Sequence, residues 1–232
     1  MTRTARNKVN RLLLAALAAT PLLAAAASGQ FTFVTGEVSL QKANGQRSVP
    51  ARGTPVDAGD RITTGRNGMA QLTMVDQARL SLRPATQFVI EAYPERRDGS
   101  ENAILSLVKG TLRTFTGLLA STNRDKFVMR TRVATVGIRG SGNILYACDP
   151  GECDESVTQG TKAGDSITVN YTIEGSHAVT NALSDRPGMP SQQGGATTLI
   201  TGPGQTVLVA GNQAPRYIPM PAFISEAATN MT

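Results

Sequence analysis

The sequence predicts an all-β protein of short strands with glycine-rich turns, arranged as a twisted β-solenoid-like or sandwich domain. From Phe31 onward, apolar and polar residues alternate over runs of about four to eight residues, which is typical of strands with one buried face. Turn residues separate these runs at intervals of roughly ten residues. The chain contains 23 glycines, no tryptophan and only 4% aromatic residues, a composition that favours many short strands joined by tight turns.

The first 27 residues have the organisation of a secretory signal peptide. An apolar run from Leu12 to Ala26, interrupted by Pro21, is followed by small residues and preceded by four basic ones, Arg3, Arg6, Lys8 and Arg11. A membrane anchor is the alternative, but the run is shorter than the roughly 18 to 20 apolar residues needed to span a bilayer. We therefore expect cleavage after Ala27, a periplasmic or secreted location, and no membrane span in the mature chain.

Removing this leader changes what the net charge implies. The whole chain carries 23 basic and 17 acidic residues, a net charge of +6. Residues 1–27 hold four of the basic residues and no acidic ones, so the mature chain has 19 against 17, a net charge of +2. The global charge therefore gives no support for nucleic-acid binding.

Residues 28–211 are expected to form one β domain. Strands at this spacing allow a sandwich, a barrel or a short β-solenoid, and outside the leader we expect no amphipathic helix. Residues 184–195 are rich in Pro, Gly, Ser and Gln and should form a flexible surface loop, while 212–232 should be an irregular tail containing prolines. The expected strands lie at 38–40, 62, 69–75, 80–82, 88–90, 104–108, 112–115, 127–136, 143–147, 167–173, 177–181, 199–200 and 207–210.

The only two cysteines, Cys148 and Cys153, flank the turn-forming segment Asp149-Pro150-Gly151-Glu152. In an oxidising compartment this spacing predicts a structural disulfide. Redox catalysis is the alternative, but it usually requires two residues between the thiols and a helix N-terminus. A zinc site would require two more ligands, and His177 is the only histidine.

Charge is segregated in the middle of the chain. Residues 104–140 have a net charge of +6 and residues 148–185 a net charge of −6. One interpretation is a docking surface for an anionic partner, in which cationic side chains share one strand face above an apolar row on the other. The other is that the two segments lie near each other and neutralise internally, or are simply solvated. The candidate interaction face consists of Lys126, Arg130, Arg132 and Arg139, and the row beneath it of Phe127, Met129, Thr131 and Val133.

Catalytic and metal-binding motifs are incomplete. Ser141 lacks the full G-x-S-x-G elbow, and His177 is the sole candidate base for a Ser–His hydrolase. The glycines at 137, 140 and 142 lack the G-x-G-x-x-G order. A cluster of carboxylates could hold Ca²⁺, but its spacing matches no known loop, and it is formed by Asp149, Glu152, Asp154 and Glu155. We therefore expect no catalytic residue, no metal and no cofactor.

The order of several motifs resembles the FecR domain, the periplasmic β domain of ferric-citrate-regulator-like proteins. The resemblance extends over most of the chain after the leader. The matching segments are Gly36-Glu37-Val38, Gly59-Asp60-Arg61-Ile62-Thr63-Thr64-Gly65, Val75-Asp76, Leu82-Arg83-Pro84, Phe88-Val89-Ile90, Leu107-Val108-Lys109-Gly110-Thr111-Leu112-Arg113, Thr131 to Ile138-Arg139-Gly140, and Ala210-Gly211-Asn212-Gln213.

The sequence also departs from this family pattern. Arg132 stands where the family often has proline, Ser141 replaces the usual threonine, and residues 146–165 look like an insertion. FecR-type signal transducers carry a cytoplasmic anti-sigma segment and a membrane span before this domain, where this chain has a leader, so control of a sigma factor cannot be carried over.

The resemblance implies an exported, non-enzymatic β domain that works by protein contact. The first hypothesis is an interaction module of the cell envelope, a signal relay or scaffold whose partner is an envelope or secreted protein. The alternatives are a binder of an anionic envelope polymer or glycan through the basic face, and a periplasmic hydrolase.

Overall fold

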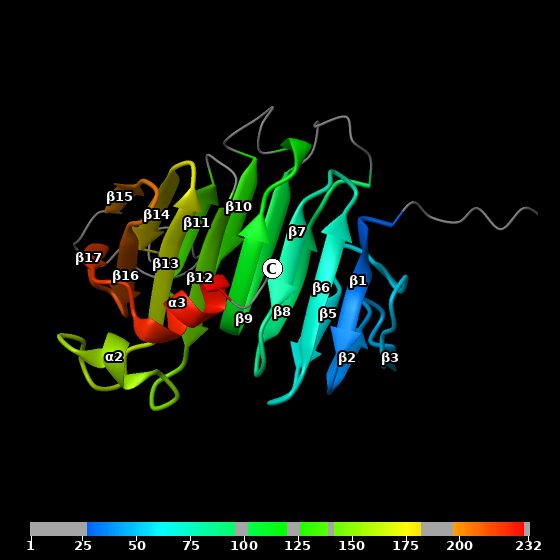
Figure 1. Cartoon of the computed structure of the whole chain (residues 1–232), viewed down its shortest axis with the longest axis horizontal. Helices are drawn as coiled ribbons and strands as arrows, with labels where there is room; N and C mark the ends of the chain where they lie inside the picture. Colours follow the sequence, from blue (N-terminus) through cyan, green and yellow to red (C-terminus); the bar gives the residue numbers. More distant parts are fainter. Residues whose placement is uncertain (1–26, 96–101, 120–125, 139–141, 182–196, 230–232) are drawn as a thin grey trace, which may run out of the picture.

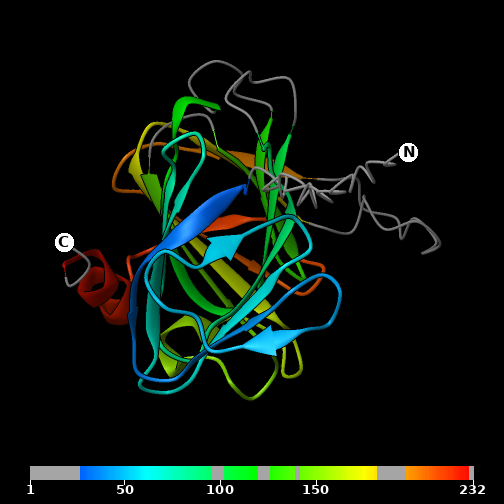
Figure 2. The same cartoon turned by 90° about the vertical axis from the view of Figure 1, so that its right-hand side faces the viewer.

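The computed structural model describes residues 27–95, 102–119, 126–138, 142–181 and 197–229. The expected signal peptide up to residue 26 and the expected loop at 184–195 lie outside the described residues. Within the described residues, the chain forms 17 strands in two facing layers, with helix α3 on the outside (Figure 1). Figure 2 shows the two layers from the end formed by β1, β2 and β3.

The first layer, called layer A, is antiparallel throughout. Each strand pairs with the next in the order β4 (Pro55–Val56), β1 (Gly29–Thr35), β6 (Met69–Met74), β7 (Arg79–Leu82), β9 (Ala103–Phe115), β12 (Gly142–Cys148), β13 (Ile167–Glu174), β16 (Thr206–Ala210) and β17 (Arg216–Ile218).

The second layer, layer B, is also antiparallel apart from one parallel pair, β9 with β10. Its order is β3 (Arg47–Ser48), β2 (Val38–Gln41), β5 (Arg61–Thr64), β8 (Gln87–Ala92), β9, β10 (Phe127–Arg130), β11 (Ala134–Ile138), β14 (His177–Asn181) and β15 (Thr198–Thr201).

Strand β9 belongs to both layers. Its first half lies between β8 and β10 in layer B, and its second half lies between β7 and β12 in layer A. Gly110, with φ of 97°, lies at the crossing. The side chains that face the core change parity there, from Leu105 and Leu107 before the glycine to Leu112 and Thr114 after it. This local irregularity keeps the apolar side of β9 turned inward as the strand passes between layers.

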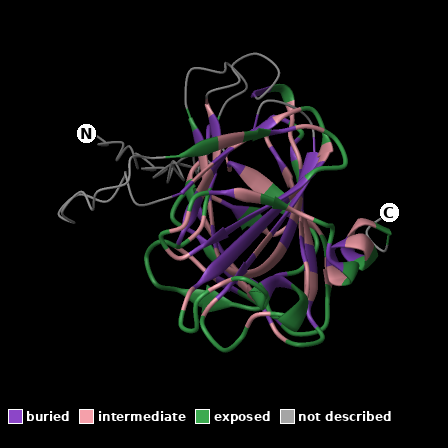
Figure 3. Ribbon diagram, turned by 90° about the vertical axis from the view of Figure 1, so that its left-hand side faces the viewer, coloured by how far each residue is buried: buried purple, intermediate pink, exposed green. Residues whose placement is uncertain are grey.

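The hydrophobic core lies between the two layers. Strands β6 and β8 have alternately buried and half-buried positions, as expected for strands with one face on the core. Buried positions are concentrated between the layers in Figure 3. The largest fully buried side chains include Phe31, Phe88, Phe127, Leu72, Leu80, Leu105 and Leu112.

The outer face of layer A is covered over β12 and β13 by helix α3 (Ala222–Thr229). Ile224 and Ala227 of the helix form a buried cluster with Ile144, and the rings of Tyr146 and Phe223 meet edge to face at 4.7 Å. Strands β12 and β13 under the helix are therefore buried on both faces over much of their length, and so is β16, whose Leu208 and Ala210 pack in a second cluster with Val157.

The structure confirms the all-β prediction but differs at two places. Residues 212–232 are not irregular throughout, since they contain β17 and α3. The expected strand at 127–136 is divided into β10 and β11 by a turn in which the amide of Thr131 donates to the carbonyl of Ala134. Among the described residues, no helix has the length and apolarity required to cross a bilayer.

Candidate interaction site

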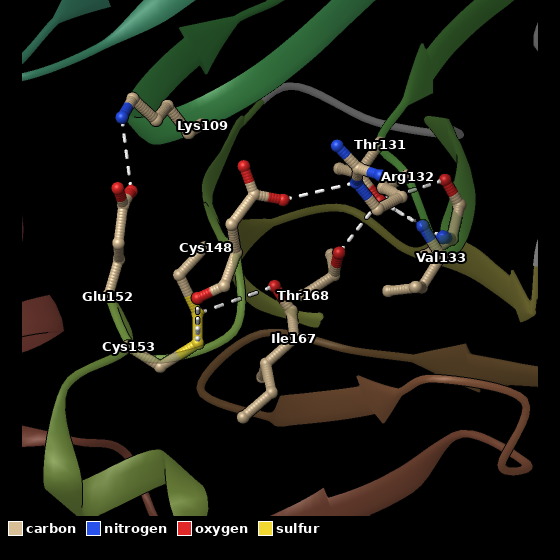
Figure 4. A network of polar contacts seen from close by, with 11 residues as sticks. Lys109, Thr131, Arg132, Val133, Cys148, Glu152, Cys153, Ile167 and Thr168 are labelled. Carbon is tan, nitrogen blue, oxygen red and sulfur yellow. Dashed lines mark hydrogen bonds and ion pairs between the residues drawn. A yellow bond between two sulfur atoms is a disulfide. The ribbon is translucent and has the colours of Figure 1, made fainter. Parts of the chain in front are cut away.

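The predicted disulfide is present. Cys148 is the last residue of β12, and its Sγ is bonded to that of Cys153, with 5.1 Å between the two Cα atoms (Figure 4). Cys148 packs in an outer apolar cluster with Val157 and Ile167. Val157 belongs to the single-turn helix α2 (Glu155–Thr158), so the disulfide and this cluster fix the β12–β13 connection to the end of layer A.

Two carboxylates of the disulfide loop reach the basic part of the chain. Oε2 of Glu152 lies 3.0 Å from Nζ of Lys109, and Oδ1 of Asp149 lies 3.1 Å from Nε of Arg132 (Figure 4). The turn that carries Arg132 is joined to β13 as well, because the hydroxyls of Thr131 and Thr168 are 2.7 Å apart. These contacts support internal neutralisation of the oppositely charged segments.

The four residues of the predicted basic face do not share one strand. Arg130 is the last residue of β10 and pairs with Glu91 at 3.1 Å, while Arg132 lies beyond the strand in the turn. Lys126 precedes β10, and Arg139 lies outside the described residues. The row beneath is buried as expected at Phe127 and Met129. Binding of a partner at these four residues stays a prediction, and two of them already hold carboxylates of this chain.

The acidic cluster has structural contacts. Asp149 and Glu152 form the ion pairs above, and Asp154 caps helix α2 by accepting a hydrogen bond of 2.9 Å from the amide of Ser156. In the part of the chain that the structure describes, no group of three or more His, Cys, Asp or Glu side chains is arranged to hold a metal ion.

His177 is a core residue. It is the first residue of β14, its side chain is fully buried, and its Nδ1 lies 3.0 Å from the hydroxyl of Thr172 and 3.3 Å from Nδ2 of Asn170. Burial lowers its pKa to about 4. A buried histidine cannot take a proton from a substrate in solvent, and Ser141, its postulated partner, lies outside the described residues.

A surface that the sequence reasoning missed lies at the end of the sandwich formed by β15 and β17. Among the described strands, β15 pairs only with β14 and β17 only with β16, so each presents an open edge. Ile200 and Tyr217 are each 51% exposed, and Met220 is 42% exposed. The hydroxyl of Tyr217 donates a hydrogen bond of 2.7 Å to the carbonyl of Ile200, which joins the two edges. The sequence feature that could have indicated this surface is Tyr217, one of four tyrosines in a chain with only 4% aromatic residues.

The model of the FecR protein family matches residues 60–161. This part of the chain belongs to the FecR family. The matched residues run from β5 to the connection after β12 and include the disulfide loop. The family model matches a shorter segment than the motifs noted in the sequence, which extend from Gly36 to Gln213.

Two crystal structures of a candidate anti-sigma factor from Parabacteroides distasonis ATCC 8503 are similar to this chain. The structure at 1.65 Å resolution has 16% identity and a TM-score of 0.46, and the similarity covers 74% of this chain and 65% of that one. The structure at 2.50 Å has 17% identity and a TM-score of 0.45, covering 72% and 62%. This chain therefore spans less than two thirds of each. No curated protein matches it.

The FecR motif residues lie inside the fold. The carboxylate of Asp60 is fully buried and accepts hydrogen bonds from Nζ of Lys42 at 2.7 Å and from the amide of Asp57 at 2.9 Å. The hydroxyl of Thr64 donates to the carbonyl of Arg83 at 2.7 Å and accepts from the amide of Thr86. These two motif residues position turns, so they contribute to the fold and not to an exposed surface.

Proposed function

We propose that this FecR chain is an exported, non-enzymatic interaction module of the cell envelope that relays a signal or scaffolds an assembly by contact with another protein. The observation that carries the proposal is the open end of the sandwich, where three exposed apolar side chains lie on or next to the unpaired edges of β15 and β17. Exposed apolar residues beside an unpaired strand edge are suited to binding an extended segment of a partner.

The mode of binding that fits this end is strand addition. A partner strand would hydrogen-bond to the outer edge of β15 or β17 and pack its apolar side chains on Ile200 and Tyr217. The hydroxyl of Tyr217 already engages the carbonyl of Ile200, so it would have to turn away for a strand to pair with β15 at that position.

Export is the second part of the proposal. The basic and apolar leader, the disulfide between Cys148 and Cys153 and the FecR membership all support a periplasmic or secreted location. Mass spectrometry of the protein from fractionated cells should find a mature N-terminus at Ser28. An intact leader in the cytosolic fraction would contradict export.

The alternative of an anionic-polymer binder at Lys126, Arg130, Arg132 and Arg139 has less support. Arg130 and Arg132 are paired with Glu91 and Asp149, and a polymer would have to displace these carboxylates. The hydrolase alternative has less support still, because its only candidate base is the buried His177.

Site-specific photo-crosslinking tests the proposed contact surface. A photoreactive phenylalanine analogue at position 200 or 217 should give a discrete adduct with one envelope protein in cells that export the chain. The matched control is Val49, which is 82% exposed and follows β3 at the opposite end of the sandwich. The same adduct from positions 49 and 200, or none from 200 and 217, would contradict binding at this end.

A further inference from the structure

A pocket on the outer face of layer A lies beside helix α3 and has no role in the function proposed above. Its volume is about 330 Å³, which is at the lower end of the range for small-molecule sites. The polar and aromatic side chains that line it come from β1, β6, β7 and β9, and they are Thr32, Gln71, Arg79, Ser81, Arg113 and Phe115.

The strand register brings these side chains together. On β7 and β9, Ser81 is opposite Arg113 and Arg79 is opposite Phe115. On β6 and β7, Gln71 is opposite Ser81. Residues directly opposite each other in an antiparallel pair point to the same face. The sequence therefore places two guanidinium groups, a hydroxyl and an amide on one solvent-facing patch next to the end of α3.

The two guanidinium groups lie over one aromatic ring. Cζ of Arg113 lies 4.7 Å from the centre of the Phe115 ring, and Cζ of Arg79 lies 5.7 Å from it. Nη1 of Arg113 donates to the carbonyl of Ala228 in the last turn of α3 at 3.2 Å. The ring packs closely on Gly142, where any Cβ would meet it at 2.9 Å. Arg113 is therefore held in position in the absence of a ligand, and the exposed Arg79 lies beside it over the same ring.

Neither guanidinium is neutralised by the described part of the chain. No acidic side chain there forms an ion pair with Arg79 or Arg113. Nε of Arg113 is buried and has no hydrogen-bond partner among the residues that the structure describes. Burial and, secondarily, the charge of Arg79 lower the pKa of Arg113. Two like charges close together raise the free energy of the folded protein, and so does a buried donor without a hydrogen-bond partner. A bound anion would lower both costs.

We propose that this pocket binds a phosphate group. Paired arginines match the planar, multiple acceptors of a phosphate, and two positive charges suit a dianion better than a single carboxylate. The hydroxyl of Ser81 and the amide of Gln71 supply neutral donors around the charged pair, while the hydroxyl of Thr32 donates to the carbonyl of Gln71 at 3.3 Å. Inorganic phosphate and the phosphate of a sugar share this chemistry.

Isothermal titration calorimetry with inorganic phosphate, glucose 1-phosphate and acetate tests the site at low ionic strength. The variant Arg79→Gln removes one charge from an exposed side chain and should weaken phosphate binding about tenfold or more. The matched control Arg47→Gln removes an exposed arginine on β3 and should leave binding unchanged. Tighter binding of glucose 1-phosphate than of phosphate would assign the pocket to a phosphorylated sugar. Equal binding of the two compounds would assign it to free phosphate.

Thermal unfolding provides a second readout. Phosphate should raise the melting temperature of the wild type and of Arg47→Gln, and should have little effect on Arg79→Gln. The absence of saturable phosphate binding to the folded wild type would overturn the proposal. Equal binding by wild type and Arg79→Gln, or acetate binding as tight as phosphate binding, would also overturn it. These outcomes are independent of the crosslinking result at β15 and β17.

Discussion

The hydroxyl of Tyr93 donates a hydrogen bond of 2.7 Å to Oδ1 of Asp76, and both side chains are buried. The same carboxylate accepts from the amide of Ala78 at 3.1 Å and, through Oδ2, from the amide of Leu119 at 3.2 Å. One buried carboxylate thus joins the turn between β6 and β7, the segment after β8 and the segment after β9. Burial, together with the charge of Asp76 and this bond, raises the pKa of Tyr93.

Tyr93→Phe should lower the free energy of unfolding by about 1.5 to 3 kcal/mol, because a hydrogen bond to a buried charged group is lost and one carboxylate oxygen loses a donor. Urea unfolding, monitored by circular dichroism, measures this change in the free energy of unfolding. Tyr217→Phe removes a hydroxyl with the same 2.7 Å bond length at an exposed site. We expect it to cost less than about 1 kcal/mol. Equal costs for the two variants would show that the buried carboxylate gives no extra stability.

Gly110→Ala should destabilise the protein by about 3 kcal/mol or more, because the backbone there has φ of 97° and a Cβ would meet Cα of Thr86 at 2.5 Å. Gly204→Ala is the matched control. It also has positive φ, at 79°, but no atom of the described residues lies within 4 Å of a Cβ there. It should cost only about 1 kcal/mol. Comparison of the two midpoints in urea separates backbone strain from steric overlap at the crossing of β9.

The double variant Cys148→Ser/Cys153→Ser should lose about 2 kcal/mol in the free energy of unfolding, the chain-entropy value for so short a loop. A reducing agent should destabilise the wild type by a similar amount and leave the double variant unaffected. Sensitivity of the double variant to the reducing agent would show that the effect does not arise from this disulfide.

Because of His177, the free energy of unfolding should decrease as the pH falls below neutrality. Its folded pKa of about 4 is below the ordinary value of 6.5, so the unfolded state binds the proton first as the pH falls. The loss should begin near pH 6.5, reach about 3 kcal/mol by about pH 4 and then level off. His177→Gln removes the only histidine, so the difference between wild type and variant isolates this contribution. A difference that does not change with pH in this window would contradict the assignment.

The sequence was sufficient for the class of fold because alternation at period two is a local signal. It was not sufficient for the path of β9, where the expected runs at 104–108 and 112–115 form one strand. Residues 108–111 break the alternation, and only the pairing partners in two different layers show that the strand continues through Gly110.

The candidate sites illustrate the same limit. The spacing of Cys148 and Cys153 was enough to predict the disulfide, since the partners are close in sequence. The open end formed by Ile200 and Tyr217, and the pocket around Arg79 and Arg113, each combine residues far apart in the chain. Helix α3 was missed because the prolines at 219 and 221 suggested irregular structure, although Pro221 stands just before a short helix, where proline is well tolerated.

Strand β9 connects two groups of strands. Every backbone pairing described between the strands that precede it and those that follow it passes through β9, which contacts β7 and β8 on one side and β10 and β12 on the other. The backbone pairings of the two groups of strands therefore meet in β9, while the shared core and the ion pair between Arg130 and Glu91 connect the groups through side chains. Residues 103–115 are thus the single seam of strand pairing between two groups of described strands, β1 to β8 and β10 to β17.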